Sequence, residues 1–143
     1  MPYHYLDNIA IADVAFEAWG ETLEEVFIAA AEATLNVMVR DLNSVESRER
    51  RTIQVQADAL DLLLFDFLQE LIFYKDSGCI LLRVEQIAIT RGGQPFSLKA
   101  EVFGEKINPQ KHELLADVKA VTLHRFQVEE TENGWKANVI LDI

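Results

Sequence analysis

The chain has 143 residues, half of them hydrophobic and 26% charged, a composition that fits one soluble domain with a sizeable core. Its 24 acidic residues outnumber the 13 basic ones and give a net charge of -11. Such a field repels nucleic-acid phosphates and attracts cations or basic protein surfaces, so charge argues against direct, stable binding of nucleic acid. We expect a single domain over residues 1–143.

Cysteine content and hydropathy limit the cellular compartment that we expect for this protein. Cys79 is the only cysteine, which rules out an internal disulfide or a cysteine-rich zinc site and suits a reducing compartment. No basic stretch followed by an apolar run begins the sequence, so we expect no signal peptide. The longest apolar stretch, 60–73, is interrupted by charged residues and is too short to span a membrane. We therefore expect a cytoplasmic protein without a membrane partner.

The first half of the chain alternates strands and helices. Apolar alternation predicts a strand over 9–18, closed by Gly20. Thr22 and Glu25 have the spacing of a capping box, which predicts a helix from there to about residue 39. A polar loop should follow, and then a strand over 52–57.

The second helix has the strongest pattern. Its leucines and phenylalanines recur at i, i+3, i+4 and i+7 from Leu60, which predicts a central core helix that ends at Ser77-Gly78. Asp58 is the expected N-cap. Cys79 should be a small buried hydrophobe at the start of the next strand.

Hairpin signals dominate the remainder. Strands are expected over 79–90, 96–107 with a break at Gly104, 117–129 and 135–143, with a loop over 108–116. The order β-α-β-α-β-β-β-β predicts an α+β fold, in which two helices pack on a mixed, largely antiparallel sheet. It excludes a regular βαβ nucleotide-binding fold, and no Gly-rich phosphate loop is present.

Carboxylates in the first and last strands are the leading candidates for chemistry. Asp13 lies in the first strand, Asp142 in the last, and the carboxylate of Ile143 would add a third oxygen if the chain ends there. Three converging oxygens would suit a hard divalent cation. On spacing alone, the simpler interpretation is that Asp13 is a polar residue on a sheet face and Asp142 a solvated terminal one.

Three further residues are candidates of lower rank. Lys119 could be a partly desolvated amine or a counter-ion for a carboxylate, although a solvent-facing lysine on an amphipathic strand explains the pattern better. His124 shares a predicted strand face with apolar residues, which is more typical of a core histidine than of a ligand. His112 stands in a polar loop, where surface exposure is expected.

Short segments spread along the whole chain resemble the archease family. They are Tyr5-Leu6-Asp7, Ala12-Asp13-Val14, Ala18-Trp19-Gly20, Val118-Lys119-Ala120-Val121-Thr122-Leu123-His124 and Ile140-Leu141-Asp142-Ile143. Each segment alone is weak, but their order, spacing and coverage make the resemblance specific.

The resemblance implies a function that composition does not. Archeases activate the GTP-dependent RNA ligase of tRNA splicing, promoting formation of the ligase–guanylate intermediate and multiple turnover. By resemblance, Asp13, Asp142 and Ile143 form a divalent-metal site, for calcium first and magnesium or manganese as alternatives. Lys119 matches the lysine needed for activation. The chain would then be an accessory protein and no enzyme itself.

One departure from the family pattern and two other functions stay open. The usual Asp-His-Thr-Ala-Asp reads here as Asp7-Asn8-Ile9-Ala10-Ile11-Ala12-Asp13, without the histidine and with two residues added. The first alternative function is a chaperone or specificity modulator of an RNA-modifying enzyme such as a tRNA methyltransferase. The second is a metal-dependent hydrolase that uses Asp13 and Asp142, although no further ligands stand at recognisable spacing.

Overall fold

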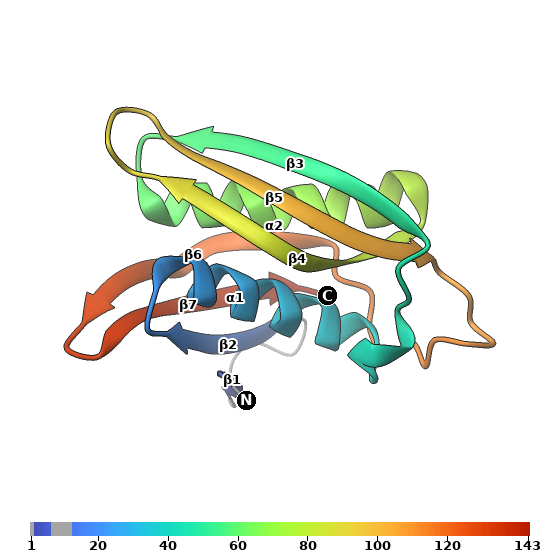
Figure 1. Ribbon diagram of the computed structural model, residues 1–143. Helices are drawn as coiled ribbons and strands as arrows, with labels where there is room; N and C mark the ends of the chain where they lie inside the picture. Colours follow the sequence, from blue (N-terminus) through green and yellow to red (C-terminus); the bar gives the residue numbers. More distant parts are fainter. Residues whose placement is uncertain (1, 7–12) are drawn as a thin grey trace.

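Residues 2–6 and 13–143 are described by the structure, a computed structural model (Figure 1). Within these residues, two helices, a 3₁₀ turn and seven strands follow one another as β1 Tyr3–Leu6, β2 Asp13–Gly20, α1 Leu23–Met38, η1 Leu42–Ser44, β3 Glu49–Ala57, α2 Leu60–Gly78, β4 Ile80–Thr90, β5 Phe96–Lys106, β6 Ala120–Thr131 and β7 Gly134–Asp142. The predicted α+β class and element order are confirmed, and β1 is an additional strand ahead of them. The altered segment 7–12, with the predicted start of the first strand, lies outside the described residues.

The strands form two antiparallel sheets. The four-stranded sheet has the order β1-β2-β7-β6, and the three-stranded sheet has the order β3-β5-β4. In the four-stranded sheet, β7 lies between β2 and β6 and is antiparallel to both. The N-terminal strands β1 and β2 and the C-terminal strand β7 therefore belong to one sheet, in which β2 lies directly beside β7 (Figure 1).

The core lies between the sheets, around the two helices. α1 contacts β2 and β7 of one sheet and β4 of the other, and α2 contacts β6 of the first and β3 of the second. Because both sheets cover them, the helices bury residues on several sides, including Phe27 and Phe67, which are fully buried. The second helix was predicted to be the central core helix, but α1 is the more buried of the two, with 11 of its 16 residues buried against 7 of 19 in α2. No helix among the described residues is long and apolar enough to cross a membrane.

The capping box at the start of α1 is confirmed. The Thr22 hydroxyl accepts a hydrogen bond from the Glu25 N–H at 3.1 Å, and the Glu25 carboxylate accepts from the N–H groups of Thr22 at 3.3 Å and Glu21 at 2.7 Å. These bonds satisfy backbone donors that have no partner within the helix, so the cap fixes where α1 begins.

The predicted end of α2 at Ser77-Gly78 is confirmed, whereas the roles predicted for Asp58 and Cys79 beside the helix were wrong. The N-cap is Ala59, without a side-chain hydrogen bond, and not Asp58. At the other end Cys79 is exposed and has a φ of 53°, so it is the left-handed cap of the helix and not a buried strand residue. A helix that ends in this way needs one residue in the left-handed region, and the chain places Cys79 there after Gly78.

Gly104 does not break β5 as expected, since the strand passes through it. A Cβ on Gly104 would lie 1.7 Å from the carbonyl oxygen of Leu81 on the neighbouring strand. The glycine thus permits close approach between β4 and β5.

Candidate functional site

The register of the four-stranded sheet brings Asp13 and Asp142 together. Asp13, at the start of β2, is the direct partner of Asp142, at the end of β7. Directly opposed residues of antiparallel strands point to the same face, with Cβ atoms about 4.5–5.5 Å apart. Both residues are half-buried. The two aspartates therefore form a carboxylate pair at one end of the sheet.

Lys119 lies at the same end of the sheet. It directly precedes β6, whose first residue, Ala120, is also a direct partner of Asp142. The backbone N–H of Lys119 donates to the carbonyl oxygen of Asp142 at 2.8 Å, while the residue itself is exposed. The predicted strand start at Asp117 is thus three residues early, and Lys119 belongs to a connecting segment that is fastened to β7.

Helix α2 holds this connecting segment on both sides of Lys119. The ammonium group of Lys75 donates to the carbonyl oxygen of Val118 at 2.8 Å and to the carboxylate of Asp117 at 2.6 Å. The side-chain oxygen of Gln69 accepts from the N–H of Val121 at 2.9 Å. The backbone around Lys119 is anchored to the core, and its side chain is left facing solvent.

Lys75 is itself buried, with 6% exposure, which normally disfavours a charged amine. Burial, the largest single influence, lowers the pKa of Lys75, but the hydrogen bonds to Asp117 and Asp76 together outweigh it, so the pKa is raised. The lysine stays charged, and the anchor persists throughout the neutral range.

A bulge in β6 places His124 away from the core. Thr122 pairs with Ile140 and Gln127 pairs with Asn138, so the residues between them on β6 bulge out of the ladder. His124 lies in this bulge and is exposed, so its interpretation as a core histidine was wrong. Strand alternation assumes regular pairing and fails at a bulge.

The bulge also forms one wall of a hollow of about 670 Å³, which sequence reasoning missed. Its lining includes Arg125, Glu17, Ala15 and Ile140. Ala15 and Ile140 are each two residues from an aspartate of the carboxylate pair, so they share its face and the hollow adjoins it. Arg125 has a φ of 55°, a backbone conformation uncommon for any residue but glycine. No sequence motif marks this conformation.

Glu17, on the same face of β2 as Asp13, belongs to a small charge network. Lys136 donates to its carboxylate at 3.2 Å and His4 lies 2.6 Å from it. The hydrogen bond from Lys136, foremost, and that from His4 lower the pKa of Glu17 against the effect of burial.

His112 was expected at the surface and is buried, with 1% exposure. Its Nδ1 accepts from the backbone N–H of Asn108 at 3.0 Å, so the proton of the neutral ring is on Nε2, which donates to Glu105 at 3.1 Å. The loop folds back over its own histidine, and His112 fastens the loop to β5. Its hydrogen bonds go to neither Asp13 nor Asp142.

Among residues 2–6 and 13–143, no cluster of three or more His, Cys, Asp or Glu side chains could hold a metal ion. The carboxylate pair offers only oxygen, which fits a hard cation better than zinc. Metal binding by Asp13, Asp142 and Ile143 stays a prediction.

Comparison with known proteins shows which family this chain is similar to. Residues 3–143 match the model of the Archease protein family (MTH1598/TM1083). The protein archease of Pyrococcus abyssi is 37% identical over 133 residues, which cover 92% of this chain and 93% of that protein. The protein archease of Methanosarcina mazei is 38% identical over 144 residues, covering 99% and 95% respectively.

Solved structures agree with the sequence comparison. The solution structure of Methanobacterium thermoautotrophicum protein 1598 has a TM-score of 0.84 at 34% identity and covers 99% of both chains. A Thermotoga maritima crystal structure, described as an archease and possible chaperone, has a TM-score of 0.65 at 22% identity, which supports the fold alone. Because the chain matches the family model over nearly its full length and resembles these relatives, it belongs to the archease family.

Proposed function

We propose that this chain is an accessory protein that activates the GTP-dependent tRNA-splicing RNA ligase by promoting its guanylylation and multiple turnover. The observation that carries the proposal is the direct pairing of Asp13 with Asp142, with the backbone of Lys119 bonded to Asp142. Asp13 and Asp142, two of the residues implied by the family resemblance, come from β2 and β7 and are paired at one end of one sheet. The ligase would hold the GTP and perform the chemistry.

Asp13, Asp142 and oxygens of Ile143 would hold a divalent cation, calcium first and magnesium or manganese as alternatives. When bound, such a cation neutralises phosphate charge. The chain's own contribution is to present two carboxylates and one lysine on a fixed backbone. Because α2 and β7 hold the backbone around Lys119, its exposed ammonium group can reach an anionic group of the partner.

The charge of the whole chain supports docking on a basic partner. A net charge of -11 favours encounter with the basic surface of an RNA-binding enzyme and opposes the approach of free RNA. The encounter should weaken as salt rises, since screening shortens to about 3 Å at 1 M salt.

A calcium titration tests the metal site. The wild-type chain should bind calcium, followed by calorimetry, and Asp13→Asn and Asp142→Asn should each weaken binding at least about tenfold. Asp66→Asn removes one carboxylate from α2 and serves as the control. Equal affinity of wild type and all three variants would contradict the proposed site.

One alternative has an observation in its favour. The Thermotoga maritima protein is described as a possible chaperone, which would fit a modulator of an RNA-modifying enzyme such as a tRNA methyltransferase. Affinity capture from native lysate separates the two functions. Recovery of the ligase supports activation of ligation, and recovery of a methyltransferase without the ligase supports the alternative.

A further inference from the structure

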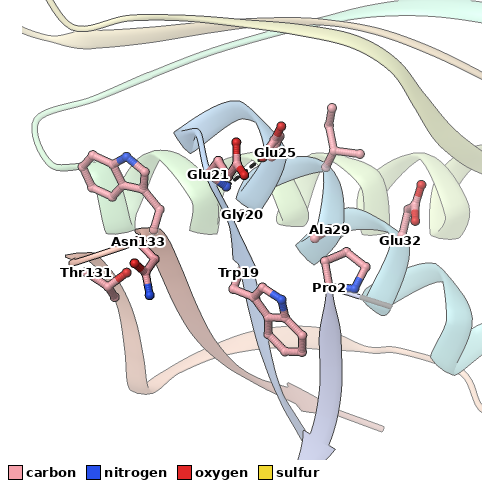
Figure 2. A pocket seen from close by; sticks show the side chains of 11 residues that line it. Pro2, Trp19, Gly20, Glu21, Glu25, Ala29, Glu32, Thr131 and Asn133 are labelled. Carbon is pink, nitrogen blue, oxygen red and sulfur yellow. Dashed lines mark hydrogen bonds between the residues drawn. The ribbon is translucent and has the colours of Figure 1, made fainter.

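A second hollow, of about 710 Å³, lies at the other end of the four-stranded sheet from the Asp13–Asp142 pair. It forms where β2 turns into α1, and the β6–β7 turn and Pro2 complete its walls (Figure 2). Trp19 and Trp135 line it together with Glu21, Glu25 and Glu32. We call it the tryptophan hollow.

Two glycines bring the walls of the tryptophan hollow close together. A Cβ on Gly134, whose φ is 144°, would lie 2.2 Å from the carbonyl oxygen of Gly20. A Cβ on Gly20 would lie 2.7 Å from the Cβ of Glu25. A side chain at Gly134 would push the β6–β7 turn away from the β2–α1 corner, and a side chain at Gly20 would push the first turn of α1 away from the end of β2. The two tryptophans and the carboxylates therefore meet because both positions are glycine.

The lining combines aromatic surface with negative charge. Trp19 is 40% exposed, a large value for a tryptophan. Figure 2 shows the carboxylates of Glu21 and Glu25 beside Gly20 and that of Glu32 further along α1. None of the lining residues within the described chain carries a positive charge.

One of the three carboxylates is free to bind a ligand. Glu25 is engaged in the cap of α1. Glu32 forms an ion pair with Arg83, whose guanidinium nitrogen lies 3.9 Å from its carboxylate, whereas Glu21 forms no side-chain ion pair with any described residue. A cationic side chain entering the hollow would therefore meet Glu21 without displacing an existing ion pair.

The fold already shows a guanidinium group on one of these indole rings. The guanidinium carbon of Arg91 lies 5.3 Å from the ring centroid of Trp135, within the range of a cation–π contact. Guanidinium is planar, stacks on aromatic rings and pairs with carboxylates, so it matches this lining better than a compact ammonium group.

We propose that the tryptophan hollow is a docking site for an arginine-bearing segment of a partner protein. The guanidinium group stacks on an exposed indole, and the carboxylate of Glu21 accepts its hydrogen bonds. The site is separate from the carboxylate pair and does not depend on the proposed activation of the ligase.

Intrinsic fluorescence reports directly on this site, because the sequence contains only two tryptophans and both line the hollow. The probe is a short peptide with two arginines and no other charged group, titrated into the protein at about 0.1 M salt, where screening acts over about 10 Å. Its matched peptides carry citrulline, an uncharged analogue of arginine, or lysine in the same positions. We expect a saturable change in fluorescence with the arginine peptide, a weaker response to the lysine peptide and none to the citrulline peptide.

Charge-matched variants separate the site from general attraction to an acidic protein. Glu21→Gln with Glu32→Gln removes two charges from the hollow, and Asp66→Asn with Glu70→Gln removes two from α2 outside it. The first pair should weaken arginine-peptide binding about five- to tenfold, and the second pair should leave it within about twofold of wild type. Circular dichroism confirms that both variants are folded.

Equal weakening by the two variant pairs would overturn the proposal, because general charge attraction would then explain the binding. Equal binding of the citrulline or lysine peptide would overturn the assignment to arginine. The absence of a saturable fluorescence change with the arginine peptide would overturn the site itself.

Discussion

Glu105→Gln should cost stability at neutral pH, and the cost should fade in acid. The Glu105 carboxylate accepts hydrogen bonds from the Lys111 ammonium at 2.9 Å, from the backbone N–H of Glu46 at 2.8 Å and from His112 at 3.1 Å. Burial, the largest single influence, raises its pKa, but the donors together outweigh it and lower the pKa of Glu105 from 4.5 to about 2.

That shift sets the size of the effect. Each tenfold change in proton affinity is worth about 1.4 kcal/mol, so the drop from 4.5 to about 2 gives a ceiling of about 3 kcal/mol. Glu105 is 8% exposed, but Lys111 is partly solvated, and solvent screening weakens their ion pair. We therefore expect Glu105→Gln to lower the free energy of unfolding by about 2 kcal/mol at neutral pH. Because the pKa is lower in the folded state, the contribution is full above pH 4.5 and is lost as the pH falls toward 2.

Urea unfolding of wild type and Glu105→Gln at pH 7 and pH 3 measures this. The difference in free energy of unfolding should be about 2 kcal/mol at pH 7 and less than half of that at pH 3. Glu101→Gln, on the same strand but outside this network, should change stability by less than about 0.5 kcal/mol. A difference that is the same at both pH values would refute the reasoning.

Three further predictions follow from the packing and the cap. Gly104→Ala should destabilise the protein by at least about 2 kcal/mol, because the new methyl group would collide with the Leu81 carbonyl. Gly93→Ala, with open space around it, should cost little, and equal melting temperatures of the two variants would contradict the prediction. Lys75→Met should cost about 1–3 kcal/mol in thermal unfolding, since the Val118 carbonyl loses its buried donor. The control Lys99→Met should be neutral, and an equally small loss in Lys75→Met would show that Lys75 does not anchor the segment before β6. Thr22→Ala should cost about 1 kcal/mol by urea unfolding through loss of the α1 cap, and an unchanged midpoint would speak against it.

Local patterns predicted most of the fold. The stripe of α2 and the capping box of α1 depend on spacing within a few residues, which the sequence contains directly. The end of α2 at Gly78 was predicted, but its two capping residues were missed because capping depends on backbone angles, as the left-handed Cys79 shows. Division into two sheets depends on which strands pair, and hydrophobic alternation carries no information about pairing.

The candidate site depends on longer-range order. Asp13 and Asp142 meet only because β7 inserts beside β2 in one particular register. Spacing in the sequence therefore favoured the interpretation that the two aspartates are unrelated, and only the family resemblance suggested that they belong to one site. His112 was placed at the surface because its neighbours in sequence are polar, but the fold covers it with its own loop. The anchors on α2 and the bulge around Arg125 have no sequence signature and came from the structure alone.

The rate of guanylylation of the tRNA-splicing ligase tests the central claim most directly. It should be measured with GTP and metal, in the presence of sub-stoichiometric wild type, Lys119→Ala or Lys99→Ala, an exposed lysine on β5 that serves as the control. Wild type and Lys99→Ala should both stimulate the ligase, and Lys119→Ala, folded by circular dichroism, should not. Full stimulation by Lys119→Ala, or a ligase indifferent to the wild-type chain, would contradict the account.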